Sequence, residues 1–176
     1  MNLIFRVLLL LLTRNRLPKI KPLEPSHTRV TVWPTDCDFN LHLTNSRYPA
    51  LLDLARTQYL IQINALSKFV RGGWKSVLSS QSISFIKEIK PFAKVDITTR
   101  VLNWDRKYCY IEHQFFVGNK LHAKALARVA FIKGKRVRSF DKLLLDLDEN
   151  SEIESPQEST QVSAWLQLLE TKKSKP

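Results

Sequence analysis

The side chains best suited to chemistry are concentrated in one turn, which the sequence pattern places between a strand and a long helix. Two acids, two asparagines and a histidine occur there in close succession: Asp36, Asp38, Asn40, His42 and Asn45. A helix N-terminus carries unpaired N–H groups and a partial positive charge, so it would polarise an acyl carbonyl placed against it. A nearby carboxylate could then attack that carbonyl or activate water.

Each of these residues also has a simple structural explanation. Asp36 and Asp38 are residue types that turns and helix caps favour, and an acid pair before a helix is a cap in most proteins. His42 could be an ordinary hydrogen-bonded histidine on a loop. Only the composite of residue types points to a site, because no member of it does so alone.

The elements beside this turn are a strand and an amphipathic helix. Residues 28–33 alternate in polarity, which is typical of a strand, and Pro34 ends the pattern. From about Asn45 to Ile63 the apolar residues recur at helical spacing. Pro49 fits the first turn of a helix, where its missing N–H costs little. The turn therefore leads directly into a helix N-terminus.

The rest of the middle region predicts four further strands joined by short turns. Alternating patterns cover residues 77–89, 95–101, 108–117 and 121–131. Gly118-Asn119 is a strong signal for a two-residue hairpin. The chain has no βαβ alternation and no internal repeat. We therefore expect an α+β fold, in which one long central α-helix is wrapped by a curved antiparallel β-sheet.

The composite at 36–56 resembles the hotdog thioesterases related to 4-hydroxybenzoyl-CoA thioesterase. The matching motifs are Asp36-Cys37-Asp38, Asn45-Ser46-Arg47-Tyr48 and Asp53-Leu54-Ala55-Arg56, and the likeness extends over roughly residues 28–140. The chain is most similar to a bacterial subgroup of single-domain, thioesterase-like proteins. This resemblance implies hydrolysis of acyl-CoA thioesters to a carboxylic acid and CoA, without a cofactor. It also implies a homodimer or tetramer, with the site at a subunit interface.

The resemblance assigns roles to particular residues. It implies that Asp38 is the catalytic carboxylate, acting as nucleophile or general base, and that the N–H near Asn45 polarises the thioester carbonyl. His42 would orient the loop or the substrate. The substrate-binding residues would be Asn40, Arg47 and Tyr48. The cation that meets the CoA phosphates stays open among Arg47, Arg71, Lys87 and Arg128.

Two features depart from the family pattern. Many relatives have a glycine just before the histidine, whereas this chain has Leu41, which restricts the loop. The central helix also lacks a glutamate at the position that the other catalytic branch of hotdog thioesterases uses. The resemblance therefore disfavours that second branch.

Two other functions remain open for a fold of this kind. Asp38-Phe39-Asn40-Leu41-His42 is similar to the aspartate–histidine pair of hotdog enoyl-CoA hydratases, although the histidine comes one residue early and a proline is absent. Alternatively, a hotdog domain with an inert site could bind acyl-CoA at a membrane surface without hydrolysing it. Release of a thiol separates these functions, because hydration and binding both leave the thioester intact.

Charge and cysteine content limit the kinds of binding partner and the compartment that we expect for this protein. The net charge is +12, from 28 Lys and Arg against 16 Asp and Glu, which favours anionic partners. No helix-turn-helix, zinc-finger or RNP-like pattern is present, so we expect no nucleic-acid partner. Cys37 and Cys109 lie in no CxxC or Cys/His cluster, which predicts no metal site. Two unclustered cysteines are typical of a reducing compartment, and we expect a cytoplasmic protein.

The composition divides the chain into three parts. Residues 1–26 are an N-terminal apolar and basic segment, 27–145 form the hotdog domain, and 146–176 are an acidic extension with a short apolar helix pattern at Trp165–Leu169. The apolar run at 1–12 is too short to cross a bilayer. Two interpretations of residues 1–21 stay open: peripheral contact with a membrane surface, or packing on the protein's own domain or a partner subunit.

Overall fold

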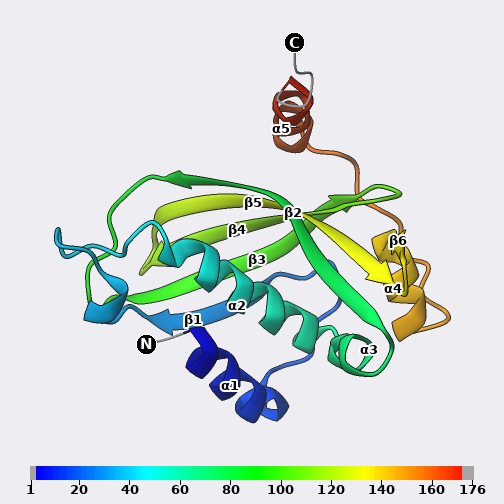
Figure 1. Ribbon diagram of the computed structural model, residues 1–176, viewed down its shortest axis with the longest axis horizontal. Helices are drawn as coiled ribbons and strands as arrows, with labels where there is room; N and C mark the ends of the chain where they lie inside the picture. The colour runs from blue at the N-terminus through cyan, green and yellow to red at the C-terminus, as the bar shows by residue number, and fades with distance from the viewer. Residues whose placement is uncertain (1–2, 172–176) are drawn as a thin grey trace.

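One antiparallel sheet forms the body of the protein (Figure 1). The structure is a computed structural model that describes residues 3–171. The strands stand in the order β1-β3-β4-β5-β2, and β6 pairs with β5. Their bounds are β1 (Ser26–Thr31), β2 (Trp74–Phe85), β3 (Lys94–Trp104), β4 (Cys109–Val117), β5 (Lys120–Lys133) and β6 (Arg136–Arg138).

The sheet curves around one long helix, α2 (Arg47–Gln62). Alanines on β5 face the apolar side of α2: Ala123, Ala125 and Ala127 are all buried in the same clusters as Ala55 and Tyr59. These alanines complete the apolar interior between helix and sheet, and the backbone of α2 lies nearest to β1 and β3. The expected α+β architecture, a long helix wrapped by a curved antiparallel sheet, is confirmed, and it is the hotdog fold.

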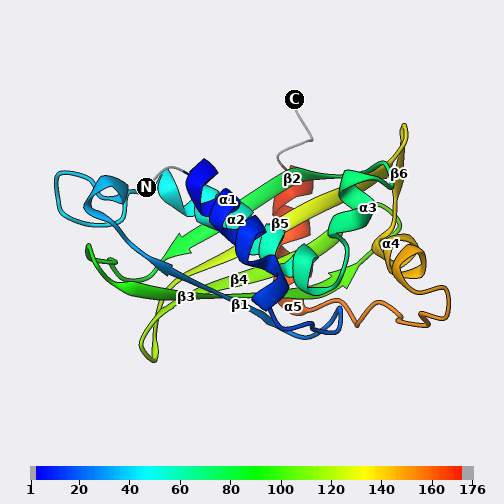
Figure 2. The ribbon, with the colours of Figure 1, turned by 90° about the horizontal axis from the view of Figure 1, so that it is seen from below.

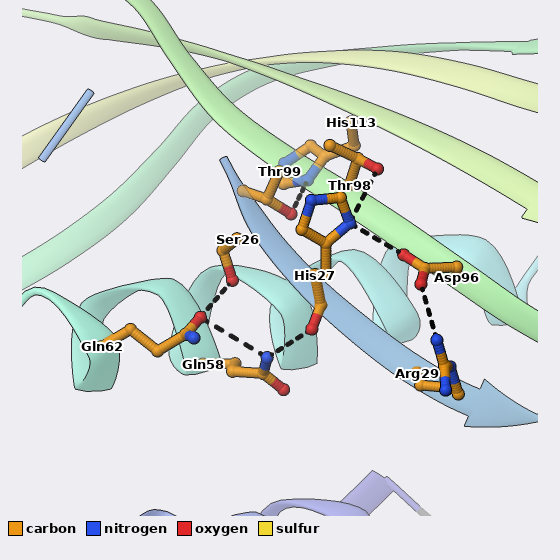
Figure 3. Close-up of polar contacts among 9 residues, drawn as sticks. All are labelled: Ser26, His27, Arg29, Gln58, Gln62, Asp96, Thr98, Thr99 and His113. Carbon is orange, nitrogen blue, oxygen red and sulfur yellow. Dashed lines mark hydrogen bonds and ion pairs between the residues drawn. The ribbon is translucent and has the colours of Figure 1, made fainter. Parts of the chain in front are cut away.

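Polar side chains also fasten α2 to the edge of the sheet. Gln58 donates from Nε2 to the carbonyl of His27 at 2.8 Å, and Ser26 donates to Gln62 Oε1 at 2.5 Å. Figure 3 shows these contacts between α2 and β1. Because Gln58, Gln62 and Ser26 are buried, these hydrogen bonds satisfy polar groups that would otherwise destabilise the interior.

The boundaries of the elements shift slightly from those the sequence predicts. The helix expected from Asn45 begins at Arg47, and the strand expected at 77–89 spans Trp74–Phe85. The hairpin at Gly118-Asn119 lies between β4 and β5 as expected. Two short helices, α3 (Leu66–Val70) and α4 (Phe140–Leu147), were not expected.

The two ends of the chain form helices on opposite sides of the sheet. α1 (Leu3–Thr13), followed by the 3₁₀ turn η1 (Arg14–Arg16), runs alongside α2 (Figure 2). α5 (Thr160–Thr171), the expected short C-terminal helix, lies on the other face of the sheet from α2. Its Val162 and Trp165 are buried against Tyr110 and Leu126.

Some expectations reach beyond the described residues. Residues 1–2 of the N-terminal segment and 172–176 of the acidic extension lie outside them. Between residues 3 and 171, no helix is both long and apolar enough to cross a bilayer. The division at residues 26 and 145 stays a prediction.

Candidate active site

The turn before α2 closes on itself as a small loop. Cys37 and Leu43 form an isolated antiparallel bridge, and the N–H of Asp38 donates to the carbonyl of His42 at 3.0 Å. The N–H of Leu43 donates to the carbonyl of Ile89 at 2.8 Å, which ties the loop to the segment before β3. The sequence from Asp38 to His42 is therefore held at both ends while its side chains stay exposed or half-buried.

Only one of the two carboxylate oxygens of Asp38 accepts hydrogen bonds from residues 3–171. Its Oδ1 accepts hydrogen bonds from the N–H of Asn40 at 2.9 Å and from the N–H of His42 at 3.4 Å. Its Oδ2 makes no hydrogen bond to any residue between 3 and 171, and the residue is exposed. One oxygen thus fixes the carboxylate in the loop, as in a turn-capping aspartate. The other oxygen is free to react.

The loop requires a left-handed backbone at Leu41, where φ is +56°. A side chain with a Cβ takes this conformation at a cost, which glycine avoids. Leu41 adopts the left-handed backbone nonetheless. The loop therefore holds a leucine in a backbone conformation that glycine adopts at lower energy.

His42 is oriented by an acid that sequence reasoning missed. Its Nε2 lies 3.0 Å from Oε2 of Glu88, which follows β2. Both side chains are partly exposed, at 35% and 45%. No sequence signal marks Glu88, because the pairing depends on where the end of β2 meets the loop.

Asp36 has a different role from Asp38. It lies in the 3₁₀ turn η2 (Pro34–Asp36), as its turn-like sequence context predicts, but it is only 3% exposed. Its Oδ2 accepts from the N–H of Trp33 at 3.0 Å and pairs closely with the guanidinium of Arg6 on α1. A buried carboxylate with these partners holds the turn together.

The start of α2 presents unpaired N–H groups. Among residues 3–171, no acceptor pairs with the N–H of Asn45 or of Ser46, and both residues are exposed. The N–H of Arg47 donates to the carbonyl of Thr44 at 2.9 Å. Free donors at a helix N-terminus can bind a partly negative oxygen such as a polarised carbonyl.

Arg47 and Tyr48, two of the predicted substrate-binding residues, both contact other residues of the protein. Arg47 donates from Nη2 to the carbonyl of Thr35 at 3.2 Å. Tyr48 is buried between Phe85 and Phe115, at ring-centroid distances of 4.9 and 5.1 Å. Burial raises the pKa of Tyr48 to about 12. Asn40, by contrast, is exposed on the loop.

A polar network inside the fold starts from Arg56. Its guanidinium pairs with Asp53, and its Nη1 lies 3.4 Å from His113 Nε2 and 3.3 Å from Gln81 Oε1. His113 is fully buried, and its Nδ1 is 2.9 Å from the hydroxyl of Thr99 (Figure 3). Burial and the charge of Arg56 hold the pKa of His113 well below its usual value, so this histidine is neutral at pH 7.

A hollow of about 200 Å³ opens beside this network, between α2 and the edge strand β2. Asp53, Arg56 and Thr57 line it from α2, and Ser76 and Leu78 line it from β2. Ile111, Val129 and Phe131 form its apolar floor. Asp38 and His42 do not line this hollow, so the loop and the hollow are separate features of one chain.

The arrangement of residues matches a known family. The model of the thioesterase-like superfamily matches residues 32–167, which is well over half of the chain. The chain belongs to the thioesterase-like superfamily.

Among the side chains of residues 3–171, no group of three or more His, Cys, Asp or Glu is placed to hold a metal ion.

Named thioesterases are among its sequence relatives. A probable thioesterase of Saccharomyces cerevisiae, YBR096W, is 29% identical over 106 residues, which cover 58% of this chain and 46% of the yeast protein. Protein THEM6 of Xenopus laevis is 27% identical over 152 residues, covering 85% of this chain and 71% of that protein. The chain thus spans about half the length of the yeast relative.

Solved structures of thioesterases share the fold. The DHNA-CoA thioesterase of Staphylococcus aureus superposes with a TM-score of 0.63 at 16% identity, covering 86% of this chain and 97% of its own. A Thermus thermophilus thioesterase, solved with coenzyme A and Zn, gives 0.58 at 20% identity, covering 75% and 100%. A probable thioesterase of Bartonella henselae gives 0.59 at 19%, covering 65% and 98%.

Proposed function

We propose that this superfamily member hydrolyses acyl-CoA thioesters to a carboxylic acid and CoA. The observation that carries the proposal is the half-engaged carboxylate of Asp38. Two backbone N–H groups fix its Oδ1, while its Oδ2 has no partner among residues 3–171. The same loop leads into a helix whose first N–H groups, at Asn45 and Ser46, are unpaired within those residues.

These parts fit one reaction. The thioester carbonyl oxygen would accept from the N–H groups near Asn45, which polarises the acyl carbon. The free oxygen of Asp38 would attack that carbon or take a proton from an attacking water. Either route adds water across the C–S bond, with the hydroxyl going to the acyl carbon and the proton to the CoA sulfur. His42, held by Glu88, would keep the loop in position.

The acyl group would lie in the hollow beside α2. Asp53 follows Arg47 by six residues, which places it about 9 Å further along the helix. A carbonyl at the start of α2 could therefore extend its acyl chain towards the hollow that Asp53 and Leu78 line. Thr57 and Ser76 on the same walls would accommodate a polar substituent on the acyl group.

Among the four candidate cations, Lys87 is the best placed for the CoA phosphates. It is exposed and adjacent to Glu88, the partner of His42. Arg47 is occupied by the carbonyl of Thr35. Arg128 is buried, with its guanidinium 4.4 Å from the ring centroid of Tyr108. Arg71 follows α3, beyond the C-terminal end of α2.

A homodimer would complete the site. The hollow opens at β2, an edge strand whose outer side has no strand partner among residues 3–171. Pairing of β2 with β2 of a second copy would close the hollow.

Both cysteines are free thiols, and the cytoplasmic location predicted from them belongs to the same proposal. Membrane contact through residues 1–21 is a separate proposal, which concerns α1.

The test is thiol release from short, long and aromatic acyl-CoAs by wild type, Asp38→Asn and Asp148→Asn. Asp148 is the matched control, because it is exposed and its Oδ1 accepts from the N–H of Asn150 at 3.0 Å, as Asp38 does from Asn40. We expect Asp38→Asn to lose roughly a hundredfold or more in rate, as for a missing catalytic carboxylate. Asp148→Asn should keep the wild-type rate.

Three outcomes would reject the proposal. If wild type binds acyl-CoA but releases no thiol, the protein is an acyl-CoA binder. If enoyl-CoA gains water while the thioester stays intact, it is a hydratase. If wild type releases thiol and Asp38→Asn does so equally fast, another group performs the hydrolysis.

A further inference from the structure

Helix α1 exposes large apolar side chains to solvent, while its one charged residue, Arg6, lies on the inner side. Its inner side buries Arg6 and Leu10. Its outer side exposes five large apolar side chains by 50% to 83%: Ile4, Phe5, Leu8, Leu9 and Leu12. The apolar face of a helix is normally buried. An exposed apolar surface of this kind marks a contact with a membrane or another protein.

The outer face of α1 is held in a fixed position. Arg6 pairs with the buried Asp36 and donates from Nη2 to the carbonyl of Thr31 at 3.2 Å. Leu10 packs into the main core beside Val30 and Leu54. Because these contacts occupy the inner side of the helix, they leave the outer side permanently directed away from the domain.

Basic residues follow the helix without acidic partners. Arg14, Arg16, Lys19 and Lys21 occur before the first acid, Glu24. All four are exposed, and none makes an ion pair with an acidic side chain among residues 3–171. Unpaired cations beside an apolar helix suit the phosphate groups of anionic lipids.

An aromatic pair extends the apolar surface next to α1. Trp33 is 44% exposed and contacts Phe92 edge to face, at a ring-centroid distance of 6.4 Å. Trp33 and Leu9 line the same groove of about 460 Å³ between α1 and β1. Tryptophan is enriched where proteins meet the membrane–water interface.

We propose that α1 docks into the interface of an anionic lipid bilayer. The helix has 11 residues, so it is about 16 Å long and lies along the surface rather than across it. Its outer side enters the boundary between headgroups and acyl chains, while the cations at 14–21 meet lipid phosphates. Asp36, the partner of Arg6, stands two residues before Asp38, so docking brings the acyl site towards the bilayer. This last consequence rests on the proposed function, whereas the docking does not.

The test is flotation of the full chain with vesicles, in the absence of any acyl-CoA. The vesicles contain phosphatidylcholine alone or with one quarter phosphatidylglycerol. We expect wild type to float with the anionic vesicles, and to float less with phosphatidylcholine alone or in high salt, where charge attraction is screened. Arg14→Gln with Arg16→Gln should bind the anionic vesicles about thirtyfold more weakly, as the loss of two surface cations predicts.

A second pair of variants separates the helix face from general hydrophobicity. Leu8→Glu with Leu12→Glu should abolish flotation. Val70→Glu with Leu168→Glu is the matched control, because both residues are exposed, one on α3 and one on α5. The control should float nearly as well as wild type. Circular dichroism checks that all variants fold.

Three results would overturn the proposal. One is wild type that floats with neither kind of vesicle, and the second is a control variant that loses as much binding as the α1 variant. The third is an oligomer in sedimentation that Leu8→Glu with Leu12→Glu dissociates, without vesicle binding by wild type. In that case α1 covers a second copy of the chain. None of these results depends on thiol release, so each leaves the proposed hydrolysis to be judged separately.

Discussion

Two aspartates that are two residues apart have opposite environments. Asp36 is buried, and it pairs with Arg6 and the N–H of Trp33. Asp38 is exposed, and one of its oxygens is free among the described residues. Desolvated carboxylates with fixed partners support structure, whereas a held but accessible carboxylate can react. At the residue scale, environment rather than residue type therefore assigns the roles.

Leu41 offers a test of strain in the loop. Its φ of +56° destabilises the folded state of a residue with a Cβ by about 1–2 kcal/mol. Replacement by glycine removes this strain but costs about 0.5–1 kcal/mol, because glycine loses more conformational entropy on folding. Leu41 is 66% exposed, so little burial is lost. We expect Leu41→Gly to raise the melting temperature by about 1–4 °C. Leu41→Ala keeps the Cβ and should bring no gain. An equal effect of both variants in calorimetry would show that the backbone carries no strain.

At the scale of elements, a buried ion pair helps to attach α1 to the domain, together with the core packing of Leu10. The guanidinium of Arg6 is 5% exposed and the carboxylate of Asp36 is 4% exposed. The Nε and Nη1 atoms of Arg6 are buried without a hydrogen-bond partner among residues 3–171. The carboxylate is therefore the main compensation for burying this cation. The pair joins the N-terminal helix to the turn that precedes the proposed catalytic loop.

Removing the charge of Asp36 should destabilise the protein. Asp36→Asn leaves Arg6 buried without a counter-charge, and breaking such a pair costs about 3–5 kcal/mol. Unfolding in urea would measure the loss. Asp38→Asn is the control, because that exposed residue has no ion pair among residues 3–171, and it should cost under about 1 kcal/mol. Similar losses from both variants would mean that α1 leaves the domain and hydrates Arg6.

At the scale of the whole molecule, helices lie on both faces of the sheet, and β2 is one of its two edge strands. α2 covers the inner face, and α5 covers part of the outer face through Val162 and Trp165. β2 is 12 residues long and exposed along most of its length, with apolar Val77, Leu78 and Phe85 among its exposed residues. A long exposed edge of this kind pairs with another strand. A twofold dimer through β2 would satisfy it.

Charges on this edge should prevent the dimer. We expect wild type to sediment at about twice the 20.5 kDa of one chain. Ser80→Lys with Ser82→Lys places like charges across the β2 pair and should give monomers with much lower thiol release. Asn119→Lys with Gln157→Lys adds the same charge at exposed sites on other segments and should stay dimeric. Dimers that persist with lysines on β2 would place the interface elsewhere.

The sequence by itself determined the features that depend on near neighbours along the chain. The alternation in the strands and the helical spacing of apolar residues at 45–63 predicted the α+β class. That α2 also buries the polar Arg56, Gln58 and Gln62 did not follow from this spacing. The Gly118-Asn119 hairpin and the Asp38 loop also follow from local chemistry. Asp38 bonds to residues only two and four positions away.

Only the tertiary structure decided which distant residues meet. His42 contacts Glu88, Arg56 contacts His113, and Arg6 contacts Asp36. These pairs depend on the curvature of the sheet and on where strands end, and no local pattern encodes either. The exposed side of α1 was equally undecided by sequence, since apolar residues occur around the whole helix and its one charged residue, Arg6, faces inward. Contact with β1 and Asp36 determined the inner face, and Ile4, Phe5, Leu8, Leu9 and Leu12 are exposed on the outer side.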